Sequence, residues 1–563
     1  MEFEFLSTES ITRRLVNRRV KLAKKNHDKA ILESYRKSSN AVCRTSDDLL
    51  IYEVMPPRNH WRTLTRKERE KVLDSISTNR KRILKTIEWD QKKNADINYL
   101  SKLELLITDI QNKGWDLNYR IKPPNIIPKK KDPTFEKKDL RPICVFNIID
   151  NIILQEVNTL LTKLFDPLFL DCSFAFRCKP SNGRIPSHHD TIAKIKEYRE
   201  QHKDETIYVA ECDLQKFFDT INHQIIKKEF FDALSETCLC LSDNQIQIIV
   251  HVFLEYLNSF DFQKSILPYN EDLLYLERNK CSGGSFAWID SSKLFEQYKN
   301  PSSERLGIPQ GGALSGIIAN LVLNVVDKSV FDADKDFLYL RYCDDMIMMH
   351  TDKCKLENKL AIYQKAVKGQ KLFIHEPIEI GAYSKEFYDS KSKKPYPWGS
   401  IQNGCVPWIS FVGYQIGFNG EVRVRKNSIN KEINKQYMVA RSALRHIQSS
   451  RYPVKSKRRI CISLYNRFIG MSVGRVKLYN YKSNIDRSMC WVNGFKELNN
   501  NRFSRAQMRL LDRARRRRYR YFCKGLNQLI GKDVQLKNGH AGSSRQIVFW
   551  GKPFSYYEWL EKK

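Results

Sequence analysis

Two adjacent carboxylates, Asp344 and Asp345, stand between two apolar runs at 338–343 and 346–349. Residues that favour β-strands dominate both runs, so the pattern predicts a β-hairpin with the carboxylates at its tip. Adjacent carboxylates repel each other, and a divalent cation shared between them removes the repulsion. An Asp-Asp pair can also be an ordinary turn, so the interpretation depends on other segments.

A third carboxylate, Asp213, ends the apolar run 207–212, which we predict to be a β-strand. If strand and hairpin share a sheet, Asp213 joins Asp344 and Asp345 in a cluster suited to two magnesium ions. One ion lowers the pKa of an attacking hydroxyl, and the other holds a triphosphate and steadies the leaving oxygen. The pattern therefore indicates phosphoryl transfer. The alternative for Asp213 is a helix N-cap.

A glycine-containing segment, Gly307-Ile308-Pro309-Gln310-Gly311-Gly312, precedes an apolar helix predicted from about residue 315. Glycines allow a backbone to approach a nucleotide or a template closely. The alternative is an ordinary glycine turn before a helix.

Three motifs in this order resemble the palm motifs of reverse transcriptases: Asp-x-x-x-x-Phe-Asp from Asp213, Pro-Gln-Gly from Pro309, and Tyr-x-Asp-Asp from Tyr342. They are similar to those of bacterial enzymes of the group II intron and retron lineage. The resemblance extends over roughly residues 120–430. It includes two fingers motifs and a primer-grip strand, at Leu140-Arg141-Pro142, at Ser173-Phe174-Ala175-Phe176-Arg177, and at Phe411-Val412-Gly413-Tyr414.

The resemblance implies metal-binding and catalytic roles for Asp213, Asp344 and Asp345. It implies two Mg²⁺ ions, with Mn²⁺ as an alternative, and makes the Leu214 carbonyl a further ligand. Cys343 is less usual at its position than alanine or valine, and we interpret it as a small packing residue. The lysine that often follows the hairpin as a general acid is not evident, which leaves His375 and Lys371 as substitutes.

The resemblance also implies a nucleotide-binding set: Lys130, Arg141, Phe218, Gln310 and Gly311. In the family, the positions of Arg141 and Lys130 hold the triphosphate through charge-assisted hydrogen bonds. The position of Phe218 excludes a ribose 2′-OH, which favours dNTPs, because that hydroxyl is what separates the two sugars. Gln310 and Gly311 match the motif that contacts template and nucleotide.

These patterns together predict an α+β fold with the right-hand architecture of a polymerase, extended at both ends. The predicted parts are a helical N-terminal extension (1–110), fingers (111–205), palm (206–425), a helical thumb (426–500) and a basic, mainly helical RNA-binding extension (501–563). The irregular stretch at about 260–305 is expected to be an insertion or mobile loop, and the primer-grip strands are expected at about 409–425.

The chain carries 97 Lys and Arg against 64 Asp and Glu, a net charge of +33. Such an excess predicts a polyanionic partner bound through its phosphates. The charge concentrates near the C-terminus, and we predict RNA-binding roles for five arginines: Arg515, Arg516, Arg517, Arg518 and Arg520. Arginines interleaved with tyrosines combine phosphate binding with base stacking. The alternative is a solvated helix face.

The resemblance implies an RNA-directed DNA polymerase that makes cDNA from dNTPs. With basic helical extensions and no nuclease pattern, the chain is most similar to reverse transcriptases of abortive infection and antiphage defence. That similarity implies a structured non-coding RNA as partner. It leaves open a homo-oligomer, untemplated synthesis, and priming from a tyrosine in 515–521 or at Tyr556 or Tyr557.

Two other functions remain alternatives. One is an RNA-dependent RNA polymerase, which the residue Phe218 disfavours. The other is a non-catalytic RNA-binding or splicing protein derived from an intron enzyme, which the intact aspartates disfavour. No secretory signal or apolar span is evident, and 14 cysteines show no zinc spacing. We therefore expect a cytoplasmic protein with reduced thiols and no membrane contact.

Overall fold

The computed structural model describes residues 5–33, 45–72, 75–93, 97–131, 136, 138–178, 183–237, 241–331, 334–379, 385–448, 457–473, 494–499 and 501–530. The chain forms two compact units. The first unit comprises residues 1–10 and 108–421, and the second comprises 11–107 and 422–563. Each unit is described by itself. The five predicted domains are finer than this division and stay predictions.

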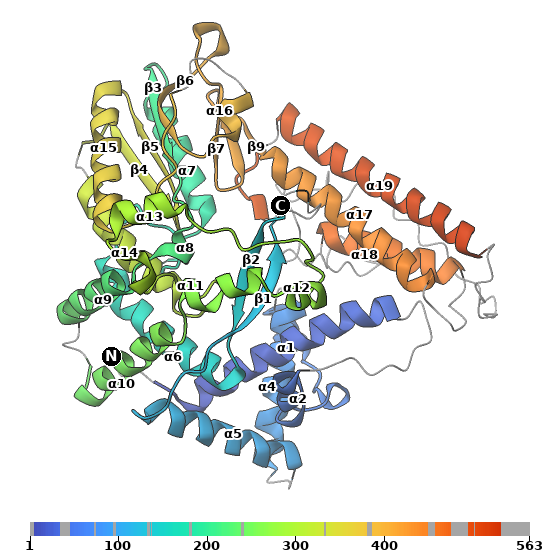
Figure 1. The fold of residues 1–563 in the computed structure, drawn as a ribbon. Helices are drawn as coiled ribbons and strands as arrows, with labels where there is room; N and C mark the ends of the chain where they lie inside the picture. The colour runs from blue at the N-terminus through green and yellow to red at the C-terminus, as the bar shows by residue number, and fades with distance from the viewer. Residues whose placement is uncertain are drawn as a thin grey trace. The chain divides into compact units, whose positions relative to one another are not determined.

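A four-stranded antiparallel sheet with the order β4-β5-β3-β6 forms the centre of the first unit. Its strands are β3 (Ile207–Cys212), β4 (Phe337–Tyr342), β5 (Asp345–His350) and β6 (Lys393–Trp398). Helix α15 (Lys353–Gly369) packs against β3, β5 and β6 (Figure 1). Residues 346–350 of β5 are all buried, because both faces of this central strand are covered.

Helices around the sheet complete the first unit. Their bounds are α6 (Ile148–Phe165), α7 (His188–Gln201), α8 (Phe217–Thr220), α9 (His223–Thr237), α10 (Asp243–Asn258), α14 (Ser315–Val330) and α16 (Lys385–Asp389). Helix α14 is buried along most of its length and packs against α6, α9 and α15. The apolar run after the glycine segment is therefore a core helix, as its periodicity predicts.

The fingers hairpin pairs β1 (Asn125–Lys130) with β2 (Leu140–Val145). Its buried face contacts the stretch at 260–305, which is not the irregular loop that we expected. That stretch forms short helices: α11 (Phe262–Ser265), η4 (Leu267–Asn270), α12 (Leu273–Arg278), α13 (Ser291–Gln297) and η5 (Pro301–Ser303). Ile126 and Leu140 share a buried cluster with Phe262 and Phe286. The stretch is therefore a structured support for the fingers hairpin.

The primer-grip strands expected at about 409–425 are present, and the segment 411–414 contains the turn between two of them. Strand β7 (Trp408–Phe411) pairs with β8 (Tyr414–Gly417), with Phe411 opposite Tyr414. The two residues between them, Val412 and Gly413, have positive φ angles of 37° and 91°, as two-residue hairpin turns require. The Tyr414 hydroxyl lies 2.7 Å from Nδ1 of His189, a residue of the predicted fingers motif.

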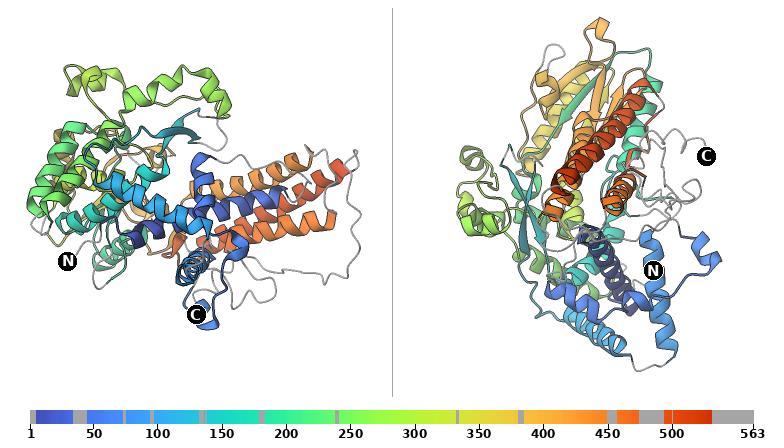
Figure 2. Two further views of the ribbon diagram at one scale, coloured as in Figure 1. Left: turned by 90° about the horizontal axis from the view of Figure 1, so that it is seen from below. Right: turned by 90° about the vertical axis from the view of Figure 1, so that its right-hand side faces the viewer.

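The second unit is helical. Its N-terminal part contains most of α1 (Thr8–Glu33), α2 (Ser46–Glu53), α3 (Arg66–Glu70), α4 (Ser75–Lys92) and most of α5 (Asn98–Trp115). Its C-terminal part contains β9 (Val422–Val424), α17 (Lys426–Gln448), α18 (Lys457–Val473) and α19 (Arg502–Ile530). Helix α19 packs against α17 and α18 (Figure 2). Ala443, Leu464 and Phe522 meet in their shared core.

Among the helices of the described residues, none is long and apolar enough to cross a membrane.

Candidate active site

The β4–β5 hairpin positions the adjacent aspartates. Tyr342 pairs with Asp345, so Cys343 and Asp344 alone form the turn, and the predicted hairpin is confirmed. Cys343 has a φ of 60°, and a positive φ at the first turn position matches the twist of the flanking strands. Burial raises the pKa of the Cys343 thiol, as for a packing residue. Asp344 therefore lies at the tip, and Asp345 is exposed at the start of β5.

A buried ion pair supports the hairpin from within. Arg341 of β4 is 1% exposed and Asp327 of α14 is 0% exposed, and Nη2 of the arginine lies 2.6 Å from Oδ2 of the aspartate. Arg341 also donates to the Ser173 hydroxyl at 2.8 Å and to the Cys343 carbonyl at 3.0 Å. The turn is thus bonded directly to the core. An arginine inside an apolar strand was the sequence signal for this pair, because unpaired arginines are almost never fully buried.

Asp213 and Asp344 come together at the ends of neighbouring strands. Strand β3 pairs with β5, with Cys212 opposite Met346, so the end of β3 lies beside the start of β5. Burial raises the pKa of Asp344, and the negative charge of Asp213 raises it further. The two carboxylates are therefore close enough to repel each other.

The backbone of Asp213 is held between two later segments of the chain. Its N–H donates to the Ser392 hydroxyl at 2.9 Å, and its carbonyl accepts from the His375 N–H at 2.9 Å. The N-cap alternative does not apply, because the next helix, α8, has Lys216 at its N-cap position. The carboxylate of Asp213 therefore does not cap a helix and can take part in the candidate active site.

A lysine that the sequence does not single out neighbours Asp213. Lys391 Nζ donates to Asp213 Oδ2 at 2.7 Å and lies 3.2 Å from Nε2 of His375. Burial lowers the pKa of His375, and the charge of Lys391 lowers it further. Lys371, the other substitute considered, instead places its Nζ 4.8 Å from the centre of the Tyr298 ring. Lys391 reaches the site because β6 pairs with β3, a pairing that no local pattern indicates.

The chemistry of the carboxylate pair fits a divalent cation. Carboxylate oxygens are ligands that Mg²⁺ prefers, and the Lys391 ammonium beside Asp213 shows that this place favours a positive charge. Among the described residues, no three His, Cys, Asp or Glu side chains form a ready-made metal site. The structure thus brings Asp213 and Asp344 together without drawing Asp345 into one cluster with them. Leu214, whose carbonyl is the further predicted ligand, is buried directly after Asp213.

The fingers hairpin separates two residues that we expected to act together. Arg141 pairs with Lys129, whereas Lys130 pairs with Leu140. Paired residues share a face, and successive residues alternate between faces. Lys130 therefore lies on the opposite face of the hairpin from Arg141, and the register does not support a joint grip on one triphosphate.

Three other cations gather around a buried carboxylate next to the site. Burial raises the pKa of Asp219 to about 6, against the opposing charges of Lys216, Lys131 and Arg141. Burial and the neighbouring Lys131 together lower the pKa of Lys216 to about 8. Two amines held this close favour the arrival of an anion. Lys131 and Lys216 are nucleotide-pocket candidates that the sequence prediction missed.

Gln310 connects three segments of this pocket. Its side chain donates to Asp219 Oδ1 at 2.6 Å, and its carbonyl accepts from the Cys144 N–H of β2 at 2.9 Å. Two residues earlier, the Ile308 N–H donates to the carbonyl of Phe218 at 2.8 Å. The loop before α14 is therefore bonded both to the fingers hairpin and to the helix that carries Phe218.

Two glycines of this loop occupy conformations that other residues rarely adopt. Gly307 has a φ of 86°, and a Cβ there would lie 2.6 Å from the Asp219 carbonyl oxygen. Gly311 has a φ of 96°. Only glycine adopts such angles without strain, so the tight path of the loop past α8 depends on them.

The predicted RNA-binding arginines lie on α19, in the second unit, but they do not form one surface. Arg515 is 5% exposed, whereas Arg516, Arg517 and Arg520 are exposed. The guanidinium of Arg518 lies 4.9 Å from the centre of the Tyr437 ring. The residues Tyr556 and Tyr557, named as priming candidates, lie outside the described residues.

Comparison with solved structures finds telomerases. Apo telomerase from Candida tropicalis has 12% identity and a TM-score of 0.35, over 86% of this chain and 83% of that chain. Telomerase from Candida albicans in complex with a fragment of telomeric RNA has 11% identity and a TM-score of 0.34, over 90% and 85%. TM-scores this low do not establish a common fold, and nothing further is inferred from these structures.

Comparison with curated proteins finds no match. Comparison with family models finds one that covers the fingers hairpin, the central carboxylates and the glycine loop. Residues 127–377 match the model described as reverse transcriptase (RNA-dependent DNA polymerase). Residues 127–377 therefore form a reverse transcriptase domain with the right-hand polymerase fold, and the protein is an RNA-directed DNA polymerase.

Proposed function

We propose that the protein copies RNA into DNA by two-metal nucleotidyl transfer at Asp213, Asp344 and Asp345. One observation carries this proposal. Asp213 and Asp344 converge from two strands, and burial together with the charge of Asp213 raises the pKa of Asp344, at a position where the Lys391 ammonium already contacts Asp213. Divalent ions held there would lower the pKa of the primer hydroxyl and neutralise the leaving pyrophosphate.

The residues of the chain have distinct tasks in this reaction. Asp213 and Asp344 would hold the cations, with Asp345 as a further ligand. The charges of Lys131, Lys216 and Arg141 all act on the buried Asp219 carboxylate, and we propose that these three cations bind the triphosphate. The ion pair beneath Cys343 keeps the hairpin tip in place, so positioning is provided before the substrate arrives.

Phe218 is the residue that discriminates between ribose and deoxyribose. Its ring is partly exposed, and its carbonyl is bonded to the loop that carries Gln310. A bulky ring beside the sugar leaves no room for a 2′-hydroxyl, so dNTPs are the expected substrates. Gln310, fixed by Asp219, contacts the nucleotide or its template base.

The biological setting that we propose is bacterial antiphage defence with a structured non-coding RNA as partner. The proposal is supported by the net charge of +33 and by basic helical extensions without a nuclease pattern, an architecture similar to that of defence-associated enzymes. Untemplated or protein-primed synthesis is the alternative within the same chemistry.

The test is nucleotide incorporation by the purified full-length protein on a DNA primer annealed to an RNA template. Wild type is expected to incorporate dNTPs in Mg²⁺, and Asp344→Asn is expected not to. Asp243→Asn, which alters an exposed carboxylate in the first turn of α10, serves as the matched control. Preferential use of NTPs would identify an RNA polymerase.

The setting is tested separately. RNA that co-purifies with the protein is sequenced before and after dNTPs are added, and cells that carry wild type or Asp344→Asn are challenged with phage. Protection that survives Asp344→Asn would favour the non-catalytic RNA-binding alternative.

A further inference from the structure

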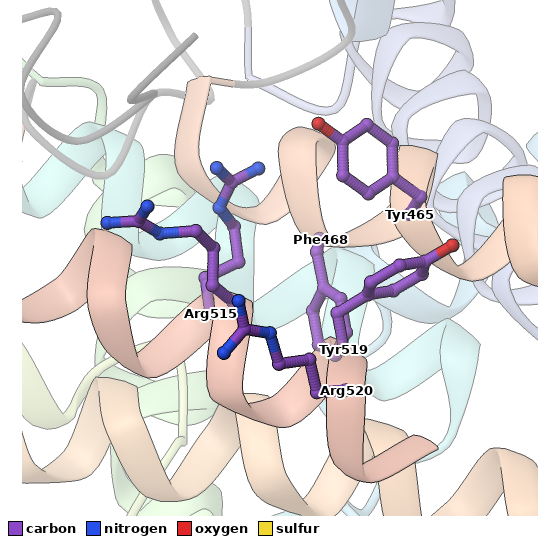
Figure 3. A pocket seen from close by; sticks show the side chains of 6 residues that line it. Tyr465, Phe468, Arg515, Tyr519 and Arg520 are labelled. Atoms are coloured by element: carbon purple, nitrogen blue, oxygen red, sulfur yellow. The ribbon is translucent and has the colours of Figure 1, made fainter. Parts of the chain in front are cut away.

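Helices α18 and α19 of the second unit enclose a pocket of about 90 Å³. That is several times the roughly 10–15 Å³ that one water molecule needs. Figure 3 shows Tyr465 and Phe468 entering it from one helix, and Arg515, Tyr519 and Arg520 from the other. The full lining is Tyr465, Phe468, Arg515, Arg516, Tyr519 and Arg520.

The floor of the pocket is aromatic and rigid. Phe468 is 1% exposed and belongs to the buried core shared by α17, α18 and α19. The rings of Tyr465 and Tyr519 lie 5.3 Å apart, edge to face, and both are partly exposed. The pocket therefore offers a fixed apolar surface for a flat ring.

The wall of the pocket is cationic. Arg515 is almost fully buried, with its guanidinium 5.8 Å from the centre of the Tyr465 ring. Burial lowers the pKa of Arg515, although the Tyr465 ring and the charge of Asp512 oppose the change. Arg516 and Arg520 are exposed and lie one helical turn apart, so they flank the same opening.

This combination restricts the ligand. A purely apolar group would make no use of the three guanidinium groups, and a bare inorganic anion would make no use of the rings. A planar ring joined to a phosphate satisfies both parts of the site. Among the described residues, the lining has no Asp, Glu, Asn or Gln, the side chains that pair with the edges of adenine and cytosine, so an adenine in this pocket is held by stacking rather than read.

We propose that this pocket takes one unpaired nucleotide of a nucleic-acid strand, with its base against the Tyr465 and Tyr519 rings and its phosphate at Arg516 and Arg520. This inference rests on the proposed function, because it assumes that the protein handles RNA or its DNA copy. It replaces the expectation of a uniform basic surface with one defined site. Of the five arginines predicted to bind RNA, Arg517 and Arg518 do not line it.

The test measures binding of full-length protein to a short RNA oligoadenylate of about twelve nucleotides, and to the same strand with abasic riboses. Base–aromatic stacking predicts a roughly tenfold preference of wild type for the strand with bases. Tyr519→Leu is expected to reduce that preference to about one without changing the slope of affinity against salt. A DNA oligoadenylate in parallel shows whether template or product is the better occupant.

Arginine variants give the matched comparison. Arg516→Ala and Arg520→Ala are each expected to lower the salt slope by about one and to reduce the base preference. Arg517→Ala removes the same charge from an exposed position of the same helix and is expected to leave the base preference unchanged. Thermal melting of each variant identifies any loss of folding, and Arg516→Ala keeps the test valid if Tyr519→Leu unfolds.

Three outcomes would overturn the inference: no base preference in wild type, a preference unchanged in Tyr519→Leu, or an equal loss of preference in Arg517→Ala. Dependence on the proposed function is checked with Asp344→Asn, which should stop incorporation and retain the base preference. Absence of incorporation by wild type would reject the proposed function while leaving the binding result to stand. Normal incorporation without base preference would reject the pocket alone.

Discussion

Arg341 in the first unit and Arg515 in the second are both buried, with 1% and 5% of their surfaces exposed, yet their surroundings differ. Burial lowers the pKa of Arg341, but Asp327 more than reverses the effect, and the net shift is upward. The pKa of Arg515 is lowered by burial, and its neighbours compensate only part of the change.

The contrast separates two uses of one residue type. Arg341 has a carboxylate at 2.6 Å and further acceptors inside the protein, so it fixes the hairpin tip. Arg515 lies against the Tyr465 ring at the edge of a pocket, beside Arg516 and Arg520, where we propose that a phosphate binds. A buried arginine whose burial cost is fully offset by neighbouring groups of the protein supports the scaffold. One whose burial cost is offset only in part marks a candidate binding site.

The largest expected effect separates chemistry in the first unit from binding in the second. Asp213→Asn or Asp344→Asn should lower nucleotide incorporation by at least about 10³-fold, because each ligand lost weakens the charge stabilisation that bound cations supply. Binding of oligoadenylate should be unchanged. Incorporation is measured by primer extension and binding by fluorescence anisotropy. A loss of both together would show that the two regions do not work independently.

Methionine substitutions test the two arginines directly. Arg341→Met leaves Asp327 as a buried charge without its partner, which should cost about 3–5 kcal/mol of unfolding free energy. Arg515→Met keeps an unbranched side chain against the rings and should cost of order 1 kcal/mol. Chemical denaturation followed by tryptophan fluorescence gives both values. Equal losses would contradict the distinction between scaffold and binding arginines.

Phe218→Ala tests whether the first unit selects dNTPs over NTPs. Removal of the ring opens space beside the sugar, so incorporation of ribonucleotides relative to deoxyribonucleotides should rise roughly 10- to 100-fold. The measurement is the ratio of kcat/KM for matched NTP and dNTP substrates. Arg516→Ala, in the second unit, should leave the ratio unchanged.

The smallest effect concerns pH. The pKa of Lys216 is lowered to about 8, so the amine is charged below pH 8 and neutral above it. Triphosphate binding favours the charged form, and KM for dNTPs should therefore rise a few-fold as pH increases through about 8. Lys216→Met should remove this dependence.

The effect of Lys216 on folding stability runs in the opposite direction to its effect on triphosphate binding: raising the pH weakens binding but stabilises the fold. Between pH 8 and the ordinary lysine pKa, the unfolded chain binds more protons than the folded protein. Stability therefore increases with pH in that window. A KM that is flat with pH in wild type would remove Lys216 from the triphosphate site.

Local sequence patterns were sufficient to predict parts of the candidate active site. The hairpin was predictable because apolar strand-forming runs flank Asp344 and Asp345, and β3 because residues 207–212 form such a run. Non-local contacts were not predictable in this way. Lys391 reaches Asp213 only through the β3–β6 pairing, and Arg341 meets Asp327 only because α14 packs beneath the hairpin.

The stretch at 260–305 and the fingers hairpin show the same limit. Helices as short as α11 and α12 carry too few residues for a periodic signal, and their stability comes from burial with Ile126 and Leu140. The alternation that separates Lys130 from Arg141 depends on the register of β1 with β2.

The interleaved path of the chain has a consequence for how the protein is made. The first unit takes residues 1–10 and 108–421, while the second takes 11–107 and 422–563. Since a chain emerges from the ribosome N-terminus first, strands β3 to β6 are synthesised before α17, α18 and α19. Residues 11–107 therefore cannot complete their unit until helices made much later have been synthesised. We expect this segment to be the part most accessible to proteases and chaperones during synthesis.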